Sequence, residues 1–108
     1  MRLQCDEKKL SFCVTKADTF FRRLCGLMFR KRLPGGEGLL LVNCRSIHMC
    51  FMRFSICAVY LDDRMTVLSL EVLRPWRIGT FVKGARHVLE VNASEGIRLS
   101  VGDRFRFS

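Results

Sequence analysis

The chain has 108 residues, of which 49% are hydrophobic and 27% are charged. This balance is typical of one folded domain with a single core, and it excludes an intrinsically disordered chain. The formal net charge of +9 favours polyanions as partners. The cations are spread along the whole chain, so a solvated basic surface accounts for them as well as a dedicated binding patch does.

The first half of the chain predicts a strand, a helix and a glycine-rich loop. Residues 10–15 alternate and are rich in strand formers. Over residues 17–28, apolar side chains recur at the spacing of an amphipathic helix. The loop over residues 33–38 lacks the Lys-Ser/Thr pair of a phosphate-binding loop and leads into a buried strand over 39–43. We therefore expect no phosphate site in this loop.

The middle of the chain predicts a β-hairpin. An apolar run over residues 56–61 and another over 65–72 flank the acidic pair Asp62-Asp63, which is a plausible tight turn although the preferred glycine is missing. A further strand is expected just before the hairpin, over residues 47–54.

The last part of the chain predicts short elements around a surface loop. Pro75 ends the second hairpin strand, because proline donates no ladder hydrogen bond, and residues 78–84 have the composition of a loop. A strand over 86–91, one helical turn between 92 and 99, and a closing strand over 105–107 follow. The pattern favours one domain over residues 1–108 that is mostly β with one main helix.

Six cysteines, with no hydrophobic leader at the start of the chain, indicate a protein of the cytoplasm. There thiols stay reduced and serve mostly as small buried side chains. The apolar stretch from Leu39 to Leu61 contains Arg45, His48 and Arg53, which are costly inside a bilayer. We expect buried strands here and no membrane span.

Motifs in the order of a known family run through most of the chain. They are Arg23-Leu24-Cys25-Gly26-Leu27-Met28, Gly38-Leu39-Leu40-Leu41, Ile47-His48, Phe51-Met52-Arg53-Phe54, Pro75-Trp76-Arg77, Val88-Leu89-Glu90 and Gly102-Asp103. Over about residues 10–107 the chain resembles the DUF192 (UPF0127) family of small prokaryotic proteins. The resemblance implies an α+β domain, mostly β, with a small barrel-like mixed sheet, one main helix and one short helical turn. It implies no reaction, because the biochemical role of the family is not established.

The chain departs from the family pattern at two positions. Ser55 stands where the family has proline, and Cys57 stands where it has aspartate. If that carboxylate were a catalytic base or a metal ligand, this protein would lack it.

A cluster of sulfur and imidazole side chains raises two chemical hypotheses. His48 and Cys50 share a face of a predicted strand, and with Cys44 and Cys57 they offer ligands for zinc or copper. The spacing is poor, because no CxxC pair is present. A Cys-His nucleophile pair would need a third group to orient the imidazole, and the sequence identifies none. We therefore expect no metal, no cofactor and no catalytic residue, and we lean against an enzyme.

Arg53 interrupts an apolar strand, and a buried arginine must be paired. In one interpretation it forms an internal ion pair with Glu71, Asp62 or Glu90. In the other it lies at the rim of a pocket and binds a carboxylate or phosphate group.

The pocket hypothesis gives the leading prediction of function. The ligand-binding residues would be His48, Arg53, Trp76 and Arg77, with the last two as a lid. The chain would then be a binding or accessory module for a small anionic ligand or an acidic protein surface. The alternative is a nucleic-acid-associated protein that uses the cations of the predicted helix and the residues after it, Arg22, Arg23, Arg30, Lys31 and Arg32.

Overall fold

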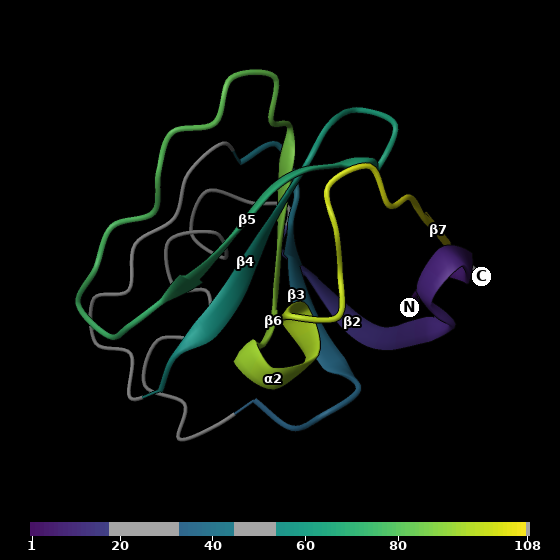
Figure 1. The fold of residues 1–108 in the computed structure, drawn as a ribbon, viewed down its shortest axis with the longest axis horizontal. Coiled ribbons are helices and arrows are strands. Elements are labelled where there is room, and N and C mark those ends of the chain that lie inside the picture. Colours follow the sequence, from purple (N-terminus) through teal and green to yellow (C-terminus); the bar gives the residue numbers. More distant parts are fainter. Residues whose placement is uncertain (18–32, 45–53, 108) are drawn as a thin grey trace.

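The computed structural model describes residues 1–17, 33–44 and 54–107. In this part of the chain seven strands form one sheet in the order β5-β4-β6-β3-β2-β1-β7 (Figure 1). The strands are β1 (Arg2–Cys5), β2 (Leu10–Ala17), β3 (Glu37–Leu41), β4 (Ile56–Leu61), β5 (Val67–Leu73), β6 (His87–Asn92) and β7 (Phe105–Phe107). The pair β2–β3 is parallel and the other pairs are antiparallel. The sheet is therefore mixed, as expected.

The predicted hairpin is confirmed as β4 and β5, joined by a turn that needs no glycine. The Asp62 Oδ1 atom accepts backbone hydrogen bonds from Arg64 (2.8 Å) and Thr66 (2.9 Å), so the side chain of Asp62 holds the turn together. Met65 supplies the left-handed residue, with a φ of 64°. The Asp62 carboxylate and the positive φ of Met65 thus allow the tight turn to form without a glycine.

Three parts of the secondary structure differ from the expectation or lie outside the described residues. The strand β1 was missed, because its alternating pattern covers only four residues. The strand β2 continues to Ala17, which the sequence pattern placed at the start of the main helix. The rest of that helix and most of the strand predicted over 47–54 fall on residues outside the described part.

The late elements agree closely with the prediction. The helical turn is α2 (Ala93–Gly96), and its N-cap is Asn92, whose Oδ1 atom accepts a hydrogen bond from the Ser94 amide at 3.0 Å. The Asn92 Nδ2 atom also donates to the Leu33 carbonyl oxygen at 3.0 Å. Asn92 therefore joins the helix to the loop that precedes β3.

The sheet is curled into a half-barrel, and its two ends approach each other at one corner. Thr66, just before β5, forms a bridge with Arg104, just before β7. The Val67 amide donates to the Asp103 carbonyl oxygen at 2.8 Å. This confirms the barrel-like α+β fold, which is mostly β.

Side chains alternate between two faces of this sheet. The inner face, on the concave side, receives buried side chains from all seven strands and from the turn after α2: Leu3, Cys5, Leu10, Phe12, Val14, Leu40, Cys57, Val59, Leu61, Val67, Leu89, Val91, Leu99 and Phe105. The outer face uses β3 to β6 and two connecting segments: Leu33, Leu39, Leu41, Ile56, Ala58, Tyr60, Leu73, Ala85 and Val88. The strand β4, which lies between β5 and β6, is buried on both faces, which explains its near-continuous apolar sequence.

Within the described ranges, no helix has both the length and the hydropathy needed to cross a membrane. The ends of the apolar stretch from Leu39 to Leu61 are strands, β3 and β4, as predicted.

Candidate functional site

The predicted ligand-binding residues are only partly placed by the structure. Trp76 and Arg77 lie in the turn that follows β5, where both are exposed, and Trp76 has a φ of 68°. His48 and Arg53 lie outside the described residues, as do the cations of the nucleic-acid alternative, Arg22, Arg23, Arg30, Lys31 and Arg32. A lid formed by Trp76 and Arg77 over His48 and Arg53 thus stays a prediction.

The structure separates two of the cysteines that were weighed as metal ligands. Cys57 is buried in the inner cluster, whereas Cys44 packs against the outer cluster. Burial raises the pKa of the Cys57 thiol to about 11, so it is protonated at neutral pH. Cys57 therefore does not belong to a soft-metal site with Cys44.

The segment between β5 and β6 presents large apolar side chains to solvent. Trp76, Ile78 and Phe81 are 61%, 77% and 66% exposed. Exposed cations alternate with them along the same segment: Arg74, Arg77 and Lys83. In Figure 1 this segment is the long green connection that projects from the end of β5 before the chain returns to β6. We call residues 74–83 the projecting segment.

Hydrogen bonds hold the projecting segment against the sheet. Glu71 of β5 accepts two bonds from Thr80, at 2.9 Å from its amide and at 3.2 Å from its hydroxyl. The buried Tyr60 hydroxyl donates to the same carboxylate at 2.6 Å. The backbone of the projecting segment is therefore bound to Glu71, and Glu71 is in turn bound to Tyr60 of the core.

The three carboxylates proposed as partners of Arg53 differ in the hydrogen bonds that they already accept. Asp62 is engaged by its own turn, and Glu71 by Tyr60 and Thr80. Glu90 is 4% exposed, and its Oε1 atom has no hydrogen-bond partner in the part of the chain that the structure describes. Of the three, Glu90 is the carboxyl group with a buried oxygen atom that has no hydrogen-bond partner among the described residues.

Glu90 and Glu71 lie in one row across the outer face. Glu90 pairs with Ala58 of β4, and Ala58 pairs with Glu71 of β5. The other neighbour of Glu90 in this row is Leu39 of β3. Burial raises the pKa of Glu90 to about 8, because an unpaired carboxylate is poorly stabilised among apolar side chains. We infer that Glu90 is largely protonated at neutral pH.

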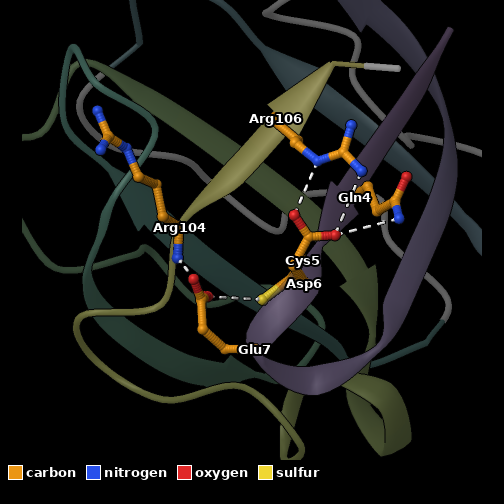
Figure 2. Close-up of polar contacts among 6 residues, drawn as sticks. All are labelled: Gln4, Cys5, Asp6, Glu7, Arg104 and Arg106. Carbon is orange, nitrogen blue, oxygen red and sulfur yellow. Dashed lines mark hydrogen bonds and ion pairs between the residues drawn. The ribbon is translucent and has the colours of Figure 1, made fainter.

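A second polar cluster lies where β1 and η1 (Asp6–Lys8) meet the start of β7. The ligand atoms of Cys5, Glu7 and Asp103 all lie within 4.8 Å of one another. The Glu7 Oε2 atom accepts hydrogen bonds from the Cys5 thiol and the Arg104 amide (Figure 2), and Asp103 accepts one from the Ser100 amide. Burial raises the pKa of Cys5 to about 11. These contacts connect the N-terminal segment of β1 and η1 to the residues just before β7.

From the sequence, Trp76 and Arg77 were proposed as ligand-binding residues, whereas the exposed apolar residues Ile78 and Phe81 of the same segment were not. Ile78 and Phe81 lie in the stretch interpreted as a surface loop, and apolar residues alternating with cations were the available signal. The anchoring contact between Glu71 and Thr80 had no such signal, because it depends on how the loop folds back onto β5.

Comparisons with known proteins agree with the fold and give no activity. A protein of unknown function from Novosphingobium aromaticivorans superposes with a TM-score of 0.86, covering 98% of this chain and 83% of that chain at 19% identity. A second structure, titled a putative transcription regulator from Sinorhizobium meliloti, has a TM-score of 0.75 and covers 97% and 89% at 18% identity. At these identities the similarity shows the fold alone.

Sequence comparisons show the family. The chain is 33% identical to the UPF0127 protein PF1050 of Pyrococcus furiosus, over 94% of this chain and 91% of that protein. It is 35% identical to the UPF0127 protein PYRAB11210 of Pyrococcus abyssi, over 82% and 80%. The family model DUF192, described as "Uncharacterized ACR", matches residues 2–107. The chain therefore belongs to the DUF192 family of uncharacterised proteins.

Proposed function

We propose that this chain is a cytoplasmic binding module that recognises an acidic, partly apolar protein segment through residues 74–83. The observation that carries the proposal is the exposure of Trp76, Ile78 and Phe81 on one short, anchored segment. Aromatic side chains and arginine are the residues most enriched in protein interfaces. Free thiols at Cys5, Cys13 and Cys57 fit a reducing compartment.

The charges of the projecting segment define the partner. Arg74, Arg77 and Lys83 are all exposed, and the chain as a whole carries a formal charge of +9. Carboxylates on the partner would meet these cations, which accelerates encounter and excludes basic competitors. Its apolar side chains would cover the three exposed residues.

The aliphatic side chain of Ile78 favours a protein partner over a nucleic acid. Single-stranded nucleic acids stack on aromatic rings, and duplexes are bound mainly through phosphate contacts. An isoleucine that is 77% exposed contributes to neither mode, but it matches an apolar side chain of a peptide. His48 and Arg53 stay in this proposal as a second anion-binding element, and they lie outside the described residues.

Trp76 is the single tryptophan of the chain, so its fluorescence reports binding at the segment directly. The titrant is a peptide of about 15 residues in which glutamate alternates with leucine and phenylalanine. A peptide with lysine in place of glutamate and a single-stranded DNA of similar length are titrated in parallel. We expect a saturable blue shift with the acidic peptide alone.

Two matched substitutions test the location. Ile78→Ser should weaken peptide binding about tenfold, as the loss of a central apolar contact does. Ile97→Ser removes an isoleucine that is 76% exposed elsewhere, next to α2, and should leave the affinity unchanged. An equal response to the lysine peptide would overturn the proposal. DNA binding that falls log-linearly with salt would overturn it in favour of the nucleic-acid alternative.

A further inference from the structure

A hollow lies at the edge of the sheet where β4 ends and β6 begins. It has a volume of about 380 Å³ and is lined, among the described residues, by Asp63, Gly84, Ala85 and Arg86. This size is within the range of small-molecule sites. None of these four lining residues carries a large apolar side chain, so the space suits a polar ligand.

The backbone around the hollow is fixed by hydrogen bonds. The Arg86 amide donates to the Leu61 carbonyl oxygen at 2.7 Å, and its own carbonyl oxygen accepts from the Cys44 amide at 2.9 Å. Gly84 has a φ of 86°, which a residue with a side chain adopts only under strain. Arg86 is thus held at its main chain, while its side chain is exposed.

The two charged residues of the hollow have opposite signs but do not pair with each other. Asp63 and Arg86 line the same space, and no ion pair joins these two described residues. Asp63 and Arg86 therefore bring opposite charges to one hollow without an ion pair between them, and we call it a bipolar site. Such a site is complementary to a molecule that carries both an anionic and a cationic group.

His87, the first residue of β6, directly follows Arg86 of the hollow. The His87 Nδ1 atom accepts a hydrogen bond from the Asn43 amide at 3.1 Å, which assigns the imidazole proton to Nε2. Burial, and then the positive charges of Arg86 and Lys16, lower the pKa of His87, and the negative charge of Asp63 opposes this shift. The imidazole is therefore largely neutral at pH 7, and the cation among the lining residues of the hollow is Arg86.

We propose that the hollow binds a small zwitterion of the α-amino-acid class, with the carboxylate on Arg86 and the ammonium group on Asp63. The planar guanidinium matches a carboxylate in a bidentate fashion. The Asp63 carboxylate accepts hydrogen bonds from the ammonium group. The hollow shares no lining residue with the projecting segment, although Gly84 directly follows that segment in the chain.

Three matched probes test the assignment: L-alanine, propionate, which lacks the amine, and ethylammonium, which lacks the carboxylate. Binding is followed by the amide NMR signals of Gly84, Ala85 and Arg86 in the full chain, a readout independent of Trp76. We expect saturable shifts with L-alanine at a dissociation constant of about 1–10 mM. Propionate and ethylammonium should each bind at least about tenfold more weakly, because each loses one charge contact.

Substitutions then assign the two ends of the ligand. Arg86→Gln should weaken L-alanine at least about tenfold, and Asp63→Asn should weaken L-alanine without weakening propionate. Arg98→Gln is the matched control, since Arg98 is exposed beyond α2 near the opposite end of β4, and it should have no effect. Shifts that do not saturate, that persist in both variants, or that are equal for propionate and L-alanine would overturn the assignment. A failure of peptide binding at Trp76 would leave this outcome unaffected.

Discussion

The inner and outer faces of the sheet bury similar aliphatic side chains but treat polar groups differently. The inner cluster consists of apolar side chains and two cysteines. The outer face includes the buried Tyr60 and Glu90, together with the half-buried Glu71. Tyr60 and Glu71, which connect the core to the projecting segment, both lie on the outer face, so the proposed function involves this face and not the inner one.

Glu71 and Glu90 lie in one row of the outer face, and they differ in the hydrogen bonds that they accept. Glu71 accepts three hydrogen bonds, from Tyr60 and Thr80. Glu90, two strands away on the far side of Ala58, has an open Oε1 atom. The same residue type thus serves as an anchor where donors surround it, and as a proton-binding group where they do not.

The largest effect is expected from Glu90→Gln, measured by urea unfolding at several pH values. The unfolded glutamate has a pKa near 4.5, and burial raises the native pKa to about 8. Between these values the native state keeps a proton that the unfolded state has lost, so wild-type stability falls as the pH rises. Glutamine cannot titrate. Its advantage over the wild type should grow from near zero at pH 4.5 to about 3 kcal/mol at pH 7.

The control for this experiment is Glu37→Gln, which removes one negative charge at an exposed position of β3. A difference between Glu90→Gln and the wild type that stays constant over pH 4.5–8 would contradict the expectation. It would mean that a cation neutralises Glu90, which is the role predicted for Arg53 as an internal ion-pair partner.

A smaller effect is expected from Gly96→Ala, which tests how tightly the inner face is packed. A Cβ atom on Gly96 would overlap the Cβ and Sγ atoms of Cys57. We expect a loss of about 2 kcal/mol in unfolding free energy, as for other overpacked cores. Gly35→Ala is the matched control, since its Cβ would lie 3.9 Å from the nearest atom, Glu95 Oε1. Equal stability of the two variants would show that the inner face tolerates extra volume.

The smallest effect is expected from Tyr60→Phe, which removes one donor from Glu71 and leaves both bonds from Thr80. The loss should be about 1 kcal/mol, with faster hydrogen exchange at the Thr80 amide. A double-mutant cycle with Thr80→Val should give a coupling energy of about 0.5 kcal/mol or more. Unchanged exchange at Thr80 would show that the projecting segment does not depend on the core tyrosine.

Local patterns of the sequence predicted the elements of the fold well. The hairpin of β4 and β5, the strands β6 and β7, and the turn α2 all follow from apolar periodicity and turn residues within a few positions. The short strand β1 has too few residues for such a pattern. Family resemblance supplied the barrel-like sheet, because the curl depends on the contact between Thr66 and Arg104, which are 38 positions apart.

The candidate sites were harder to predict, because they depend on side chains distant in the chain. Trp76 and Arg77 were proposed from the sequence as a lid, and the structure shows that both are exposed. The hollow requires Asp63 and Arg86, which belong to different connections and meet only when β4 and β6 pair. For Glu90, a charged residue inside an apolar run was visible, but its open oxygen atom depends on which donors the neighbouring strands provide.

The corner at which the curled sheet meets itself has a consequence for assembly. The strands β5 and β7 are the two outermost strands of the sheet, and exposed strand edges recruit further copies into aggregates. Backbone bonds from Val67 to Asp103, from Gly102 to Val67 and from Phe105 to Met65 occupy the facing ends of both edges. These bonds leave fewer free backbone groups at the facing ends of β5 and β7 for pairing with the strand of another copy.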